Sequence, residues 1–134
     1  MNRKICSVAV LAILLALAPG LAAQSETDKS AAEARALGYI HTVATAQREY
    51  KKKHGEYARS LTALVGKGSF TRRMASPDRG DYTVKFGGNG AGYSLSLTPK
   101  TFDAEHRAFF ASEGGTIHVE ADKPATSQSP SLKQ

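Results

Sequence analysis

Residues 46–66 read AQREYKKKHGEYARSLTALVG, and this stretch decides the fold. Three lysines and a histidine stand directly before Gly55, where basic side chains complement the negative end of a helix dipole. The glycine itself suits the left-handed conformation in which many helices end. Ser60 then precedes an apolar stretch that closes on Gly66. The stretch therefore predicts a helix that ends just before Gly55, a turn, and a short second helix over 61–65.

Upstream of this stretch, apolar or large side chains recur every three or four residues, as on one face of a helix. They are Ala32, Ala36, Ile40, Val43, Gln47 and Tyr50. Ser25, Thr27 and Asp28 are possible capping residues, so the helix is expected to begin near Lys29. Gly38 weakens a helix by about 1 kcal/mol relative to alanine. A helix over 29–54 would span roughly 40 Å, long for a small domain, so its first turns are expected to project beyond the core.

The other face of this helix carries small and polar side chains, with two apolar residues at its edge. We expect a partner-facing surface made of Ala34, Leu37, His41, Ala44, Arg48 and Lys52. The small Ala34 would let another helix approach closely, and Leu37 and Ala44 would add apolar area. The same residues also fit a face that contacts only water, and the sequence leaves that alternative open.

After Gly80 the period of the apolar residues changes to two, which indicates strands with one buried face. Residues 82–86 and 93–97 alternate in this way and are joined by a glycine-rich hairpin loop. Residues 107–111 and 116–120 form a second pair. The sequence thus predicts an α+β fold, in which one long N-terminal amphipathic helix packs on a four-stranded antiparallel sheet.

Two segments lack such a pattern. Residues 67–80 contain Pro77 and Gly80 and are expected to be irregular. Residues 124–134 have little apolar content and are expected to form a disordered C-terminal tail. This leaves one domain over residues 24–123.

The first 23 residues divide as a secretory signal peptide does. Arg3 and Lys4 precede an apolar run over 8–17, and small residues follow up to Ala23. The run is about ten residues, well short of the roughly 20 that cross a bilayer as a helix. We therefore expect cleavage near Ala23, a mature protein in the periplasm or outside the cell, and only transient contact with the membrane. An uncleaved membrane anchor is the alternative.

Composition narrows the classes of partner. Cys6 is the only cysteine and would leave with the signal peptide, so no disulfide is expected. The whole chain has a net charge of +6, and loss of Arg3 and Lys4 with the signal peptide would leave +4, which is a mild excess. A nucleic-acid-binding protein would show a denser basic stripe with interleaved aromatic residues, so no nucleic-acid partner is expected.

The sequence resembles type IV pilins and type II secretion pseudopilins at particular residues. The stretch where the stem helix meets the head in such proteins is similar to Thr45-Ala46-Gln47, Tyr50, Gly55, Tyr57, Ser60-Leu61 and Leu64. Residues 107–120 and 129–132 resemble the C-terminal hairpin and tail of the same group. The resemblance extends over residues 36–132 and implies a pilin-like head.

The chain departs from this group at its N-terminus. No Gly-Phe-Thr-Leu-x-Glu string is present, and residues 19–29 separate the apolar run from the amphipathic helix. We therefore expect an exported, non-enzymatic pilin-like module that binds an envelope or secretion-system protein. The first alternative is a membrane-tethered minor pseudopilin, and the second is a small-ligand carrier or an enzyme that uses the groove between helix and sheet. The oligomeric state is left open.

No motif indicates catalysis or a resident cofactor. The four histidines are scattered, and no serine has a histidine or aspartate beside it in sequence. The resemblance to pseudopilins raises calcium, with Asp103, Glu105 and Glu113 as oxygen donors. Their spacing lacks the clustered Asp or Asn residues of a calcium loop, so no cofactor is expected.

Overall fold

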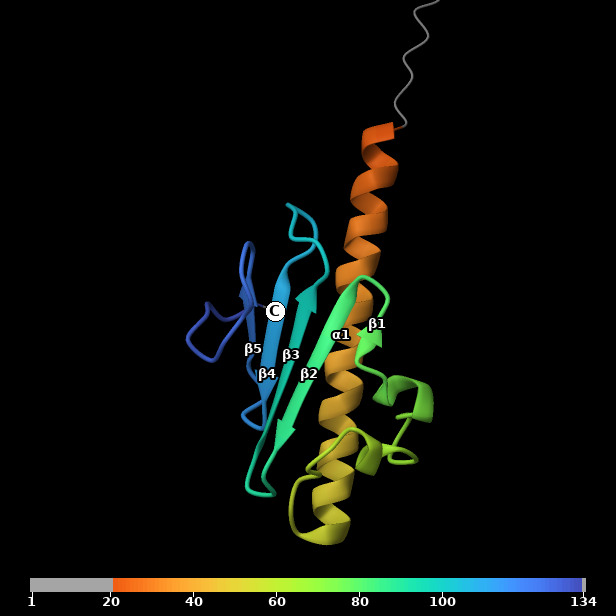
Figure 1. Ribbon diagram of the computed structural model, residues 1–134, viewed down its shortest axis with the longest axis vertical. Coiled ribbons are helices and arrows are strands. Elements are labelled where there is room, and N and C mark those ends of the chain that lie inside the picture. Colours follow the sequence, from red (N-terminus) through yellow and green to blue (C-terminus); the bar gives the residue numbers. More distant parts are fainter. Residues whose placement is uncertain (1–20, 134) are drawn as a thin grey trace, which may run out of the picture.

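The computed structural model describes the backbone of residues 21–133 and the side chains of residues 31–133. It has an α+β fold, as expected, with one long helix and one antiparallel sheet (Figure 1). The elements are, in chain order, the helix α1 (Leu21–His54), the 3-10 helices η1 (Thr62–Leu64) and η2 (Arg72–Ala75), and the strands β1 (Asp78–Arg79), β2 (Tyr82–Gly88), β3 (Tyr93–Pro99), β4 (Ala108–Ser112) and β5 (Ile117–Glu120). Neighbouring strands in the sheet are also neighbours in the chain.

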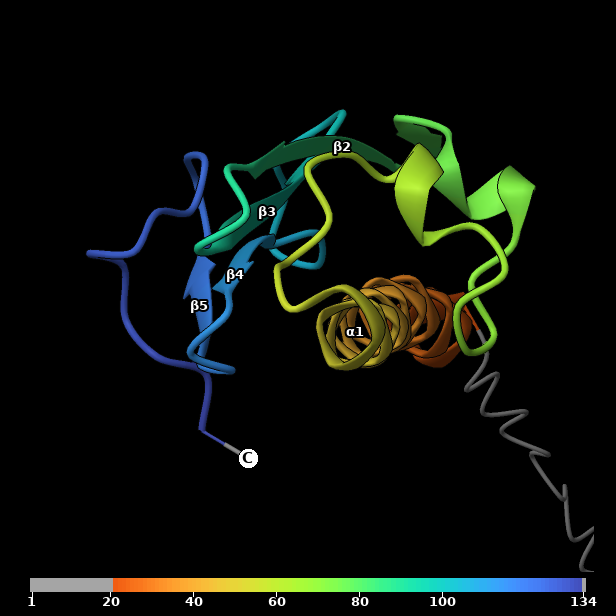
Figure 2. The ribbon, with the colours of Figure 1, turned by 90° about the horizontal axis from the view of Figure 1, so that it is seen from below.

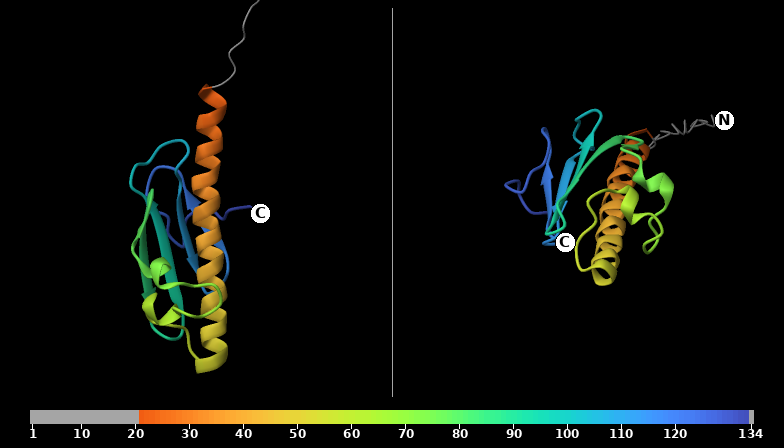
Figure 3. Two further views of the ribbon diagram at one scale, coloured as in Figure 1. Left: turned by 90° about the vertical axis from the view of Figure 1, so that its right-hand side faces the viewer. Right: turned by 60° about the horizontal axis from the view of Figure 1, so that its bottom comes forward.

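The helix α1 lies along one face of the sheet and continues past its upper end (Figure 1; Figure 3, left). It is unbroken through Gly38, but it does not begin near Lys29. The expected capping residues, Ser25 to Asp28, lie inside the helix. A capping residue begins a helix only where the residues before it are not helical. The alanines and Gln24 that precede Ser25 favour the helical conformation, so the helix starts earlier.

The end of α1 is as predicted. Its last turn is basic, and Gly55 has a φ of 78° with its N–H bonded to the Lys51 carbonyl at 2.7 Å. The short helix that was expected over 61–65 is η1, one turn of 3-10 helix. The Ser60 hydroxyl accepts the Ala63 N–H at 3.3 Å, which fits its expected capping role.

The sheet has five strands rather than the four that the sequence predicts. The additional strand β1 lies in the segment that was expected to be irregular, and it pairs Asp78 with Thr83 and Arg79 with Tyr82. A tight turn at Gly80, with a φ of 70°, brings the two strands together. Two residues are too few to show an alternating pattern, so only this pairing identifies β1 as a strand.

The prediction of a disordered C-terminal tail is wrong. Residues 130–132 lie beside β5, where the Pro130 carbonyl accepts the Val119 N–H at 2.9 Å and the Leu132 N–H bonds to the Ile117 carbonyl at 2.7 Å. Ala125 and Ser129 are also buried. Backbone hydrogen bonds help to hold this segment, and amino-acid composition does not reveal them.

The hydrophobic core lies between α1 and the inner face of the sheet, with the segment around η1 and η2 flanking it beside β2 (Figure 2). Its almost fully buried apolar side chains are Val43, Ala46, Ala58, Leu64, Phe70, Leu95, Leu97, Ala108 and Phe109. One polar side chain, Gln47, is completely buried among them. Its Oε1 accepts the Ala58 N–H at 2.8 Å and its Nε2 donates to the Ala58 carbonyl at 3.1 Å, which fixes the chain that leaves α1.

The predicted export segment lies outside the described residues except for its last three, which form the first turn of α1. Within residues 21–133, no helix is both long enough and apolar enough to cross a membrane.

Candidate functional site

The six residues that the sequence nominates for partner binding lie along one side of α1, and four of them are turned away from the core. We call them the helix strip. Four of its side chains are exposed, namely Ala34, His41, Arg48 and Lys52. The other two, Leu37 and Ala44, are half-buried, and Leu37 also packs against the core. The strip therefore combines a polar rim with a narrow apolar edge.

The helix strip is largely free of contacts with the rest of the domain. A Cβ built on Gly38, which lies beside the strip, would meet no atom within 4 Å. Arg48 donates to Thr45 on the same helix at 2.9 Å, and its charge also acts on Tyr93 of the sheet. The surface of α1 is therefore open to another molecule along this side.

One ion pair ties the upper part of α1 to the sheet. The Arg107 Nε and Nη2 atoms donate to the two carboxylate oxygens of Glu33 at 2.9 and 2.7 Å, in a bidentate geometry. The Glu33 side chain is 16% exposed, so the pair is only partly screened by water. The hydrogen bond to Glu33 raises the pKa of Arg107. This pair joins the helix to the residue that precedes β4.

The three carboxylates nominated for calcium do not form one site. Asp103 lies in the loop between β3 and β4, where its Oδ1 accepts the N–H groups of Glu105 and His106, each at 2.9 Å. Glu113 follows the far end of β4 and accepts the Tyr93 N–H at 3.2 Å. The length of β4 therefore separates Asp103 from Glu113. In the described part of the chain, no group of three or more histidine, aspartate or glutamate side chains is placed to hold a metal ion.

The histidines are used individually. His54 lies against Tyr50 with ring centroids 4.3 Å apart, and His41 is exposed on α1. His106 Nδ1 is 2.9 Å from Asp103 Oδ1, and His118 Nδ1 is 2.7 Å from the Ser129 carbonyl. The three histidines with a contact therefore serve different parts of the fold, and the four do not converge on one site.

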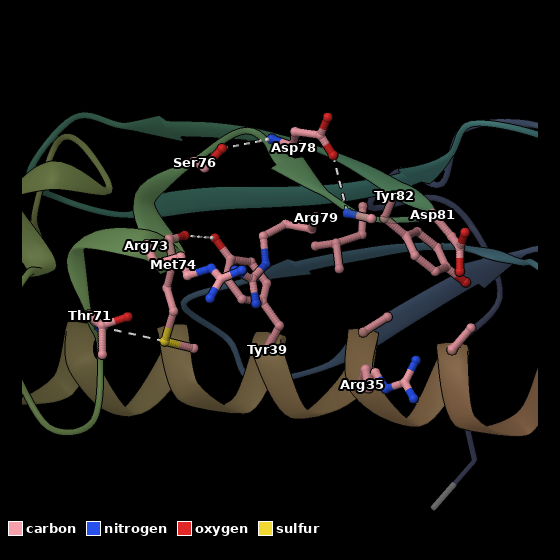
Figure 4. A pocket seen from close by; sticks show the side chains of 14 residues that line it. Arg35, Tyr39, Thr71, Arg73, Met74, Ser76, Asp78, Arg79, Asp81 and Tyr82 are labelled. Atoms are coloured by element: carbon pink, nitrogen blue, oxygen red, sulfur yellow. Dashed lines mark hydrogen bonds between the residues drawn. The ribbon is translucent and has the colours of Figure 1, made fainter.

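A pocket that the sequence does not predict opens between α1, η2 and β1 (Figure 4). It has a volume of about 680 Å³. One arginine from each of the three elements lines it, namely Arg35, Arg73 and Arg79. The sequence analysis considered a groove between helix and sheet but did not predict these residues, because η2 and β1 lie in the segment expected to be irregular.

Tyr39 forms the back of this pocket. Its hydroxyl donates to the Met74 carbonyl at 2.9 Å, and the Arg79 guanidinium lies 4.7 Å from the centre of its ring. Burial raises the pKa of Tyr39 to about 12, against a smaller opposing effect of Arg79. The phenol therefore stays protonated at neutral pH and keeps its hydrogen bond. These contacts of Tyr39 join α1 to η2 and to β1.

No protein-family model, curated protein or solved structure matches the chain. The features available to assign a function are therefore the helix strip on α1 and the arginine-lined pocket beside it.

Proposed function

We propose that this protein is an exported, non-enzymatic pilin-like interaction module, which binds a protein of the cell envelope or of a secretion system through the helix strip. The observation that carries the proposal is that α1 is covered by the sheet on one side only. Its other side is exposed at Ala34, His41 and Arg48, and its upper turns extend past the strands (Figure 1).

The side chains of the strip suit a second helix as the partner element. Small residues such as Ala34 and the neighbouring Gly38 allow two helix axes to approach to about 8–10 Å. Half-buried Ala44 and Leu37 would bury additional apolar area on contact. The cations at Arg48 and Lys52 would favour a partner with acidic side chains at the matching positions.

Capture from an envelope extract of the source organism tests the proposal. The strip variant carries Ala34→Arg and His41→Arg, and the matched control carries Thr83→Arg and Thr116→Arg, which are exposed and lie away from the strip. Both variants replace two exposed side chains with arginine. We expect the control to bind the same partner as the wild type. The strip variant should lose at least about tenfold in affinity, or about 1.4 kcal/mol. Equal binding by both variants, or a lone monomer without any partner, would contradict the proposal.

A membrane-tethered minor pseudopilin is the second proposal, and one observation favours it. The helix α1 runs without interruption from Leu21 through the polar residues 25–28, where a break was expected. A stem helix that is continuous with the head helix is what a tethered pseudopilin requires. Mass spectrometry of the mature protein separates the two proposals, because an N-terminus near Gln24 leaves no tether, whereas retention of Met1 or Asn2 supports one.

A further inference from the structure

The pocket between α1, η2 and β1 gathers positive charge from elements that are distant in sequence. Arg35 comes from α1, Arg73 from η2 and Arg79 from β1, and all three side chains line one space of about 680 Å³ (Figure 4). A volume of that size is typical of small-molecule sites. Arg35 and Arg73 are exposed, so the core does not bury their charges.

The acidic side chains at the pocket already have other partners. Asp78 accepts the Lys100 Nζ at 2.9 Å and the Gly80 N–H at 3.1 Å. Asp81 Oδ2 lies 3.9 Å from His106 Nε2. Within residues 31–133, none of the three pocket arginines forms an ion pair with a carboxylate. The lining therefore carries three arginines against two aspartates, and one of these aspartates, Asp78, is already paired with Lys100.

Arg79 is held in place before any ligand arrives. Its guanidinium lies against the ring of Tyr39, and the Tyr39 hydroxyl is itself bound to the Met74 carbonyl. A guanidinium presents its N–H groups as a rigid planar fork that matches the two oxygens of a carboxylate or phosphate. Because the side chain of Arg79 is half-buried and stacked, little conformational entropy remains to be lost on binding.

We propose that this pocket binds a small oxyanion ligand, a carboxylate or a phosphate, with Arg79 as the fixed contact. Arg73 and Arg35 are exposed and would contact the ligand from opposite sides of the pocket. Ala32 and Ala36 add apolar atoms to a lining that is otherwise largely polar, with Thr71, Ser76 and Asp81 among its residues. This site is separate from the helix strip and does not depend on the proposed pilin-like function.

The test is isothermal titration of the full mature chain with citrate and with pyrophosphate, against sodium chloride at matched ionic strength. We expect saturable binding of at least one of the two anions with a Kd of about 1 mM or tighter, and none of chloride. The stronger of the two anions identifies the ligand as a carboxylate or as a phosphate.

Two charge-removing variants and a matched control assign the site. Arg79→Gln and Arg73→Gln should each weaken binding by about tenfold, since each removes a charge-assisted hydrogen bond. Arg72→Gln is the control, because Arg72 lies in the same 3-10 turn but does not line the pocket. Arg73 is exposed, so its variant remains informative if Arg79→Gln fails to fold. Absence of binding, suppression by chloride alone, or an equal loss in Arg72→Gln would overturn the proposal.

Discussion

The two halves of α1 are held by different kinds of contact. The lower half, residues 39–54, buries Val43, Ala46 and Gln47 completely, and Gln47 is hydrogen-bonded to the chain that leaves the helix. The upper half, residues 21–38, is tied through the Glu33–Arg107 pair, with the small side chains of Ala32 and Ala36 buried beside it. The lower half is thus fixed by the core on its inner face, while its outer face and the upper half stay available to a partner.

The largest expected effect is on the lower half, from Gln47→Leu. Leucine has a similar volume but no amide, so the N–H and the carbonyl of Ala58 would both be left buried without a partner. We expect the free energy of unfolding to fall by about 3 kcal/mol. Arg48→Leu is the control at the neighbouring exposed position and should change stability by less than about 0.5 kcal/mol. Urea denaturation measures both, and a loss below about 1 kcal/mol for Gln47→Leu would show that the Ala58 turn does not hold the lower half.

Gly88→Ala tests the same turn after α1 from the side of β2. A Cβ at this position would lie 2.6 Å from the Ala58 carbonyl oxygen and 2.9 Å from the Arg59 Cα, and both are backbone atoms. The turn after α1 would have to move away from β2, at a cost of about 2 kcal/mol. Gly87→Ala is the matched control, because its Cβ would meet only the Ser94 hydroxyl at 3.3 Å. Thermal unfolding should separate the two variants, and equal melting temperatures would mean that the turn yields easily.

The upper half should respond less strongly. Glu33→Gln removes the charge opposite Arg107, and we expect a loss of about 1 kcal/mol, because the pair is bidentate and only partly exposed. The loss should shrink at high salt. Glu56→Gln is the comparison, since its 3.5 Å pair with Arg59 is well exposed and should contribute almost nothing. A double-mutant cycle with Arg107→Gln would give no coupling energy if the pair does not tie the upper half to β4.

The smallest effect is expected where the halves meet. Gly38→Ala adds a methyl group in open space on the exposed side of α1, so it should stabilise the protein by about 0.5–1 kcal/mol. Gly55→Ala is the opposite case, because Gly55 has a φ of 78° and alanine there would be strained. Thermal unfolding followed by circular dichroism should show a higher melting temperature for Gly38→Ala and a lower one for Gly55→Ala. A destabilised Gly38→Ala variant would indicate a bend at the junction of the two halves.

Local patterns in the sequence were sufficient for the regular parts of the fold. The basic turn before Gly55 marks the end of α1, because charge and glycine conformation act within a few residues. The alternation in β2 and β3 gives the buried face correctly, and the structure pairs Val84 with Leu97 and Phe86 with Leu95. These features depend on neighbours in the chain, which a sequence displays directly.

The parts that were not predicted depend on contacts between distant residues. The two residues of β1 form a strand only because the chain turns back at Gly80. Arg35 and Arg79 are 44 positions apart in the sequence. They line the same pocket only because α1 and β1 pack together. Gln47 was correctly placed on the inner face, but its bond to Ala58 requires the fold of the turn.

The C-terminal segment on β5 has a consequence for how the molecule behaves in a crowded solution. A sheet can lengthen indefinitely by recruiting further chains wherever its outermost N–H and C=O groups are vacant. Residues 130–132 bind the Val119 N–H and the Ile117 carbonyl, so these two groups at the outer edge of β5 already have partners in the same chain. Proteolytic removal of residues 130–132 would expose the edge of β5 and allow strands of other molecules to pair with it, which promotes aggregation.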